Sequence, residues 1–357
     1  MRRQQIVGLC FSIVITSVAA GAQPRGDPAG PSPVPATTVT ERTYRNGSAL
    51  PFRRVERRTE SGGRKVFIET AEATGIEGTW EPVEEVVTDT SRGQRDVFRF
   101  DLDGRRKLAE TTRSEETQVN GRTRNVQRTW VADLDGRLTL TSGYVEETTS
   151  IAPGIRHTDA TVSRLSPEGT LRQAERSQST EQQVSSAVVR HDSTYSLRDP
   201  NGRWIPTESR SGETRGIGST ERVGEETIQL PNVNGRLVVR DTVVTRTSES
   251  NTEHRVVIET YSQDAEGFGR SDSRVALRER VRRSTTVTAD GGRSIVEEVE
   301  ARNVAAPEDP MRMIRRTVTT MRSVGAGRTI TERQMFERDP NGRMVLVADD
   351  TQETTDR

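Results

Sequence analysis

The segment Asp199–Arg203 (DPNGR) carries the feature that decides the fold. A type I turn favours Asp, Asn or Ser at its first position, Pro at its second and Gly at its fourth, where the chain enters the left-handed region and forms a bulge. The first four residues satisfy each of these positions, and Asp339–Gly342 (DPNG) satisfies them again. The segment therefore predicts the tip of a β-hairpin, with Arg203 starting the return strand.

Related tips recur along the chain at a fixed spacing. The tip glycines follow one another at intervals of 32, 33, 33, 33 and 32 residues, and they are Gly104, Gly136, Gly169, Gly202, Gly235 and Gly267. A second set of chain breakers lies about halfway between them, at Asn120-Gly121, Pro153-Gly154, Ser185-Ser186, Arg215–Gly218 and Asn251-Thr252. Looser tips continue the spacing on both sides of this regular block. A fixed period of this kind is typical of a repeat architecture.

The repeat predicts an all-β fold. Reversals come about every 16 residues and leave strands of about 11 to 13 residues, so two strands make a unit of about 33 residues. Thr and Val, which favour strands, are among the commonest residues between the tips. We expect a repetitive antiparallel β-meander over residues 39–350, either an open twisted sheet or a wide barrel or superhelix. Each hairpin would depend chiefly on its neighbours.

The composition excludes several classes of function. Among 357 residues, 53 Lys+Arg balance 53 Asp+Glu, so no basic excess attracts the chain to nucleic acid. One cysteine allows no internal disulfide, and three histidines offer little material for a metal or acid–base site. The sequence also lacks a Gly-x-Ser-x-Gly elbow and a glycine-rich phosphate loop. We therefore predict no catalytic, cofactor-binding or metal-binding residues, no cofactor and no nucleic-acid partner.

The N-terminus has the pattern of an export signal. Met1–Ala22 combines Arg2 and Arg3, an apolar stretch and a small-residue end, which predicts a secretory signal peptide cleaved after Ala22. Residues 23–38, rich in Pro and Gly, are expected to form a disordered linker, and residues 351–357 a C-terminal tail. No later segment approaches the roughly 20 apolar residues of a membrane-spanning helix. The expected location is secreted or periplasmic, with no integral membrane segment after cleavage.

Weak alternation along the strands argues against a membrane barrel, which needs an apolar residue at every second, lipid-facing position. The strand from Leu138 to Ile151 places Glu146 on one face and Glu147 on the other. A two-sheet sandwich needs a denser core than a 30% hydrophobic composition supplies. Cross-strand Thr–Thr and Arg–Glu pairs are expected to hold the sheet together, alongside a thin aromatic stripe of Trp80, Phe98, Trp130, Tyr144, Tyr195, Trp204, Tyr261 and Phe336.

Three groups of residues suggest sites, and each has a structural explanation that we favour. The Asp-x-Asp/Asn-Gly tips resemble calcium ligands but stop after two acidic or amide positions, so we interpret them as turns. His157, His191 and His254 follow tip glycines at similar distances, and His157 and His191 would form a weak metal or pH-sensitive site only if they stacked on adjacent hairpins. Adjacent carboxylates on a strand point to opposite faces, so no such pair makes a glycosidase site, as at Glu146-Glu147, Glu225-Glu226 and Glu297-Glu298.

The function predicted by these exclusions is that of an exported, non-enzymatic β-repeat protein of a bacterial envelope or its exterior. It would act as a scaffold or interaction surface, binding an unknown protein or glycan of the cell envelope through many weak contacts. An exported hydrolase that gathers carboxylates from separate hairpins is the alternative. Self-association through edge strands is a further expectation, because unpaired edges template strand addition.

Overall fold

The computed structural model describes residues 36–46, 52–61, 64–74, 78–263, 275–303, 309–325 and 328–356. Residues 1–35 lie outside this range, and with them the predicted signal peptide and most of the predicted linker. The described residues form 20 strands. Their bounds are β1 Ala36–Asn46, β2 Phe52–Ser61, β3 Arg64–Thr74, β4 Trp80–Asp89, β5 Gln94–Phe100, β6 Arg106–Val119, β7 Arg122–Ala132, β8 Leu138–Ala152, β9 Ile155–Leu165, β10 Leu171–Ser185, β11 Val188–Arg198, β12 Trp204–Ile217, β13 Glu221–Pro231, β14 Leu237–Glu249, β15 Glu253–Gln263, β16 Val275–Val287, β17 Arg293–Ala301, β18 Arg312–Gly325, β19 Arg328–Arg338 and β20 Met344–Asp356.

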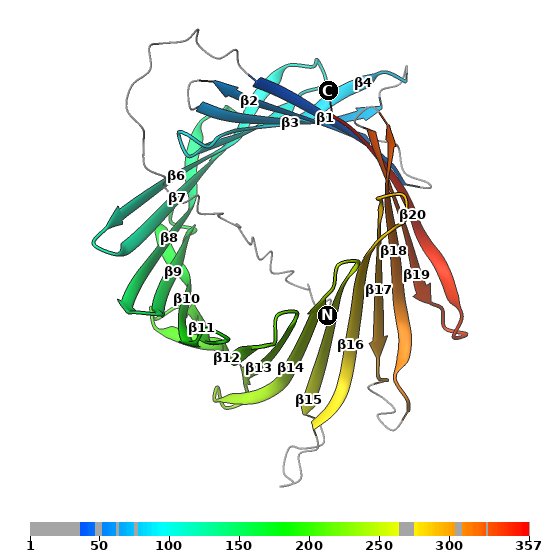
Figure 1. Ribbon diagram of the computed structural model, residues 1–357. Helices are drawn as coiled ribbons and strands as arrows, with labels where there is room; N and C mark the ends of the chain where they lie inside the picture. Colours follow the sequence, from blue (N-terminus) through cyan, green and yellow to red (C-terminus); the bar gives the residue numbers. More distant parts are fainter. Residues whose placement is uncertain are drawn as a thin grey trace, which may run out of the picture. The chain divides into compact units, whose positions relative to one another are not determined.

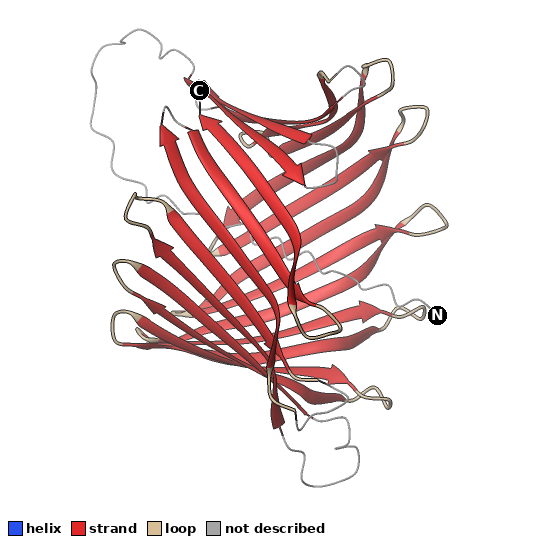
Figure 2. Ribbon diagram, turned by 90° about the vertical axis from the view of Figure 1, so that its right-hand side faces the viewer, coloured by secondary structure: helices blue, strands red, loops and turns tan. Residues whose placement is uncertain are grey.

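The strands form one antiparallel meander in which each strand pairs with the next in the chain. The last strand then returns to the first, because β1 pairs with β20 from Thr40↔Asp356 to Asn46↔Asp350. Figure 1 shows the strands following one another round a ring in chain order, and Figure 2 shows them tilted, with hairpin connections at both ends. The predicted all-β meander is confirmed, and of the alternatives left open the pairing selects the wide barrel. Strands reach from Ala36 to Asp356, beyond the expected range 39–350 at both ends.

The hairpin tips have the geometry that their residues favour. At Asp199–Arg203, the N–H of Gly202 donates to the carbonyl of Asp199 at 2.9 Å, and the N–H of Asp199 donates to the carbonyl of Arg203 at 2.9 Å. Gly202 has a φ of 82°, in the left-handed region that favours glycine. The Asp199 carboxylate accepts a further bond from the N–H of Arg203 at 2.7 Å. These bonds confirm the predicted turn. The equivalent tip at Asp264–Gly267 lies outside the described residues.

A β-bulge follows nearly every one of these tips. In β8 the extra residue is Thr141, since Thr129 pairs with Ser142 while Trp130 pairs with Leu140. The same shift occurs in β4, β6, β10, β12, β14, β16, β18 and β20. A bulge places two residues opposite one and changes the phase of side-chain alternation along the strand. Each even-numbered strand from β4 to β20 therefore alternates in one phase near the tip and in the other phase beyond it.

The sheet is a single layer with almost no core. Among the described residues, the buried hydrophobic side chains are Val97 and Val299. Stability therefore comes from the backbone hydrogen bonds of the ladder and from cross-strand side-chain pairs, each worth about 0.2 to 1 kcal/mol. In the described part of the chain, no helix has the length and apolar character needed to cross a membrane.

Candidate functional site

The register divides the sheet into two faces, because residues that pair across an antiparallel ladder point to the same side. We call them the Trp130 face and the Tyr144 face. On β7 the Trp130 face carries Arg124, Val126 and Arg128 together with Trp130, whereas the Tyr144 face carries the residues between them. Gln127, which pairs with Tyr144, is one of these. The assignment is consistent from strand to strand around the ring.

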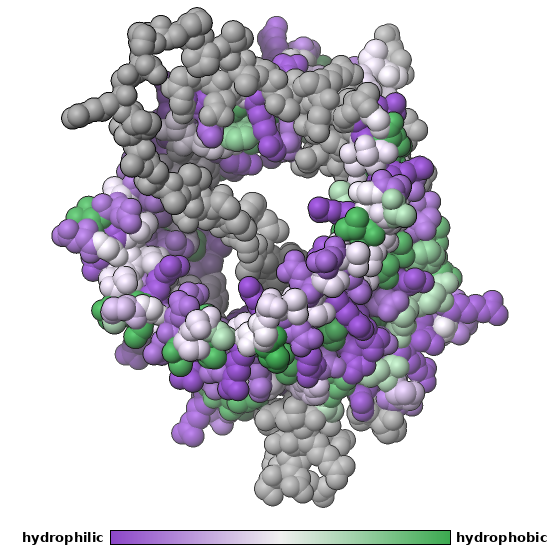
Figure 3. Space-filling view, in the orientation of Figure 1, coloured by the Kyte–Doolittle hydropathy of each residue, from purple (hydrophilic) through white to green (hydrophobic). Residues whose placement is uncertain are grey.

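An apolar belt lies on the Trp130 face beside the hairpin tips. It is built from cross-strand pairs at equivalent repeat positions, such as Phe98 with Leu108, Trp130 with Leu140 and Phe336 with Leu346. The bulges bring both partners of each pair to the same face. The belt comprises Trp80, Phe98, Leu108, Trp130, Leu138, Leu140, Leu165, Leu171, Trp204, Leu237, Val239, Tyr261, Leu277, Phe336 and Leu346. In Figure 3 apolar residues occur as separate patches among polar ones.

The predicted aromatic stripe is divided between the two faces. Six of its members belong to the belt, whereas Tyr144 and Tyr195 lie on the opposite face. Arginines cover several belt rings, as Arg106 does at 3.5 Å from the centroid of Phe98. An arginine in this position shields the ring while its guanidinium stays in contact with water. The prediction of one stripe was wrong because it ignored which face each residue occupies.

Beyond the belt, the Trp130 face carries charged residues that are paired with one another. Glu259 accepts from Arg246 at 2.5 Å and from Arg280 at 2.8 Å, and its side chain is only 9% exposed. Glu300 continues this ion-pair ladder with Arg280 at 3.5 Å and with Arg282 at 2.9 Å. Similar pairs occur at Arg124–Glu147, Arg176–Asp159 and Arg190–Glu213. Opposite charges across a ladder stabilise the register.

The Tyr144 face holds a hollow of about 230 Å³ over β8 to β11, which we call the tyrosine hollow. Small residues, Thr158, Ala160, Ser177 and Ser179, form its floor. Tyr144 on β8 and Tyr195 on β11 stand at its sides, three strand spacings or roughly 14 Å apart at the backbone. Each tyrosine is fixed by a carboxylate. The Tyr144 hydroxyl donates to Glu146 at 2.5 Å, and the Tyr195 hydroxyl donates to Glu175 at 2.6 Å.

The two carboxylates of the tyrosine hollow differ in charge balance. Glu175 accepts two bonds from Arg164, at 2.8 Å from Nε and 2.5 Å from a terminal nitrogen. Glu146 receives only the tyrosine hydroxyl among the contacts of the described residues. Its cross-strand partners are Asn125 and Ala160, neither of which is cationic. The adjacent Glu147, on the Trp130 face, pairs with Arg124 at 3.2 Å.

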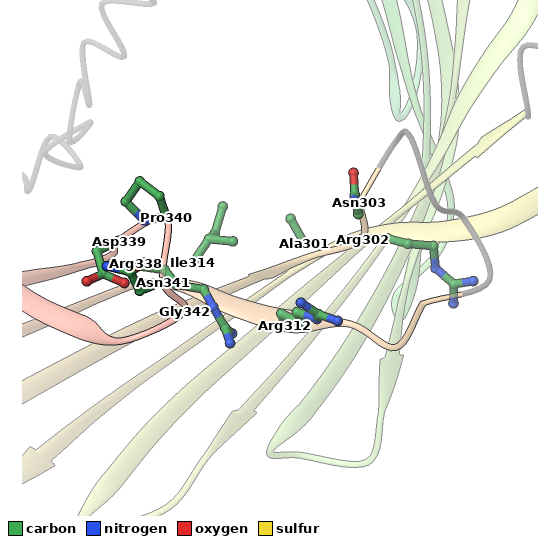
Figure 4. A pocket seen from close by; sticks show the side chains of 10 residues that line it. All are labelled: Ala301, Arg302, Asn303, Arg312, Ile314, Arg338, Asp339, Pro340, Asn341 and Gly342. Atoms are coloured by element: carbon green, nitrogen blue, oxygen red, sulfur yellow. The ribbon is translucent and has the colours of Figure 1, made fainter.

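A second hollow, of about 410 Å³, lies at the tip end between β17–β18 and β19–β20 (Figure 4). Arginines and the Asp339–Gly342 tip line it. The Arg338 guanidinium donates to the carbonyl of Met313 at 3.4 Å, and Arg312 pairs with Asp309 at 3.1 Å. These cationic groups are already engaged by the protein, so the tyrosine hollow is the better candidate for binding a solute.

The residues that suggested a metal site or a glycosidase site do not come together in the structure. His157 lies on the Trp130 face and bonds to Thr180 at 3.2 Å, whereas His191 lies on the Tyr144 face and bonds to Glu226 at 3.2 Å. The two histidines therefore do not stack. Adjacent carboxylates occupy opposite faces, as expected, at Glu146-Glu147, Glu225-Glu226 and Glu297-Glu298. No group of three metal-ligating side chains occurs within the described ranges.

Comparison with known proteins identifies the fold. No protein-family model matches the sequence, and no curated protein matches it. Two crystal structures of OccK3 (OpdO) from Pseudomonas aeruginosa align at a TM-score of 0.51 and 12% identity, over 90% of this chain and 95% or 97% of theirs. The outer membrane protein OpdK from the same organism covers 90% of this chain and 98% of its own at 11% identity, but its TM-score of 0.45 is too low to carry an argument. The chain thus shares its fold with the OccK3 barrel.

The likeness to the OccK3 structures and the pairing of β1 with β20 correct several predictions. A scaffold or interaction surface, with a hydrolase as the alternative, was the wrong class of function. The secreted or periplasmic location was wrong, as was the absence of an integral membrane segment. The envelope protein or glycan partner stays a prediction. Self-association through edge strands was wrong, because the pairing of β1 with β20 leaves neither strand as an edge.

The argument against a membrane barrel has a physical flaw. Alternation was judged along whole strands, but each bulge reverses its phase partway. On β8 the Trp130 face holds Leu138 and Leu140 before the bulge, and Val145 after it. If the alternation is counted without the bulge, Leu138 and Leu140 fall on one face and Val145 falls on the other. The tyrosine hollow was missed for a related reason, since its members come from four strands and meet only when the register is known.

Proposed function

We propose that the chain forms a non-enzymatic β-barrel channel in the outer membrane, through which small polar solutes pass. The observation that carries this proposal is the ring closed by β1 and β20, which surrounds the open centre seen in Figure 3. Strands of 10 to 15 residues predominate, and a tilted membrane-crossing strand needs about 9 to 11. The predicted export signal and the likeness to the OccK3 barrel support the same location.

In this proposal the two faces of the sheet contact different surroundings. Outer membrane barrels turn aromatic girdles toward the lipid interface and polar side chains toward the lumen. The Trp130 face, with its apolar belt, accordingly faces outward. The Tyr144 face lines the lumen, where its hydroxyl, amide and carboxylate groups contact water and solute.

Charged residues on the outward face are compatible with a membrane because they are paired. An isolated charge is very costly in a medium of low dielectric constant, whereas a paired and hydrogen-bonded one is far less so. Glu259 lies between Arg246 and Arg280, and Glu300 lies between Arg280 and Arg282. The ladder thus presents nearly balanced charge to its surroundings.

The proposal is tested by reconstitution of the full chain. Protein refolded in detergent is added to planar lipid bilayers and to preformed vesicles. We expect stepwise increases in conductance, and co-flotation with the vesicles in a density gradient. Protein that stays in the aqueous fractions and leaves the bilayer conductance unchanged would contradict the channel. Flotation without conductance would contradict an open lumen.

A further inference from the structure

We propose that the tyrosine hollow is a binding site for a small organic cation, with Glu146 as the residue that holds its positive charge. The inference deepens the proposed channel by naming the class of solute that its wall recognises. It rests on the channel proposal only in assuming that the Tyr144 face points into the lumen.

The shape of the hollow limits the size of the ligand. Its volume of about 230 Å³ is smaller than the 300 to 1,000 Å³ of pockets for drug-sized molecules. The floor consists of alanine, serine and threonine, with Val162 beside Tyr144, so the two tyrosines stand above smaller side chains. A solute of one ring or a short chain fits between Tyr144 and Tyr195. Hydroxyls of Ser177 and Ser179 on the floor are available to polar groups of that solute.

The electrostatics of the hollow select the charge of the ligand. The Glu175 carboxylate is balanced by Arg164, and the Arg176 guanidinium is directed to Asp159. Glu146 has only the Tyr144 hydroxyl as a partner in the described contacts. One negative charge therefore remains over the floor. An ammonium or guanidinium group would form with it a charge-assisted hydrogen bond, which is stronger than a neutral one.

The tyrosines favour an organic cation over a metal ion. Aromatic rings attract alkylammonium groups and contact carbon-bound hydrogens well. A divalent metal would need several carboxylate or carbonyl ligands around one point, and no such group is found among the described side chains. The site is therefore suited to a primary amine on a hydroxylated or short aliphatic body.

The test compares three probes of similar size. Isothermal titration calorimetry on the full chain in detergent micelles is carried out at pH 6 with glucosamine, with uncharged glucose and with anionic gluconate. We expect measurable binding of glucosamine that weakens with added salt, and at least tenfold weaker binding of the other two. Equal binding of glucosamine and glucose, or no binding of glucosamine, would overturn the proposal.

The matched variants are Glu146→Gln and Glu147→Gln, which remove neighbouring carboxylates from opposite faces. Glu146→Gln should weaken glucosamine binding at least tenfold, whereas Glu147→Gln should leave it unchanged. Similar losses in both variants would overturn the assignment. If Glu146→Gln fails to give a strand-rich circular dichroism spectrum, Tyr144→Phe serves in its place and should weaken binding severalfold. Calorimetry does not require conductance, so binding without conductance would reject the channel alone.

Discussion

The Trp130 face and the Tyr144 face belong to the same strands but differ in how their residues are used. The Trp130 face gathers leucine and aromatic pairs beside the tips and neutralises its charges in ladders such as Arg246–Glu259–Arg280. The Tyr144 face carries small hydroxyl residues around two tyrosines and leaves Glu146 without a cationic partner in the described contacts. In the proposed channel, the first face contacts lipid and the second face contacts a polar solute.

The difference also shows what a β-bulge contributes to a repeat. Phe98 with Leu108 and Phe336 with Leu346 occupy the same face only because one residue in β6 and one in β20 are extra. Without the bulge, the second member of each pair would turn to the opposite face. The bulge thus concentrates apolar residues in a belt in a chain whose overall composition is polar.

The largest effect is expected from placing charge in the apolar belt. The double variant Trp130→Asp with Leu140→Asp replaces one cross-strand pair, and Val131→Asp with Thr139→Asp replaces the adjacent pair on the other face. The first should lower insertion into vesicles at least tenfold, about 1.4 kcal/mol, because carboxylates are unfavourable at a lipid-facing position. The second should insert nearly as well as the natural chain. Vesicle flotation measures insertion of both variants. Equal losses would show that lipid does not contact the Trp130 face in preference to the Tyr144 face.

A smaller effect is expected from opening the ion-pair ladder. Glu259→Ala removes a nearly buried carboxylate with two arginine partners, and should lower the free energy of unfolding by about 2 kcal/mol. Glu213→Ala is the control, because this carboxylate is more exposed than that of Glu259, at 19% against 9%, and exposed ion pairs contribute little to stability. Urea unfolding in micelles measures both. A smaller loss for Glu259→Ala than for Glu213→Ala would argue against a stabilising ladder.

Two glycines allow a test of packing on each face. A Cβ at Gly212, on the Tyr144 face, would lie 2.5 Å from the Glu225 carbonyl oxygen and 2.7 Å from the His191 ring. At Gly143, on the Trp130 face, the nearest atom is the Leu171 side chain at 3.4 Å. Gly212→Ala should therefore cost about 1 to 3 kcal/mol of unfolding free energy, and Gly143→Ala less than about 0.5. Equal stability of the two variants in urea unfolding would mean that His191 does not lie over β12 as described.

The smallest effect is expected at the tips, outside both faces. Hydrogen bonds from the N–H of Arg105 and from Lys107 hold the pKa of Asp101 below its usual value. Because the folded pKa is lowered, the contribution of this carboxylate to stability is present above about pH 4 and is lost as the pH falls further. Asp101→Asn should flatten the pH dependence of unfolding below pH 4, since Asn232 makes the same turn bonds with an amide. An unchanged acid dependence would contradict this role.

The meander follows from local features of the sequence. The tips such as Asp199–Arg203 are local, because the turn is specified by Asp, Pro and Gly at adjacent positions. Their regular spacing then fixes which strand follows which, and antiparallel neighbours follow from short connections. Tyr144 and Glu146 were also visible as individual residues, but nothing local joined them to Tyr195 and Glu175.

The two faces, the closure of the ring and the tyrosine hollow depend instead on pairing between strands. A single extra residue such as Thr141 reverses which side a side chain occupies, and its position depends on pairing across strands rather than on the residues around it. Closure depends on β1 meeting β20, more than 300 positions later in the chain. The tyrosine hollow needs four strands in register. These features are non-local, and a pattern read along one strand at a time does not contain them.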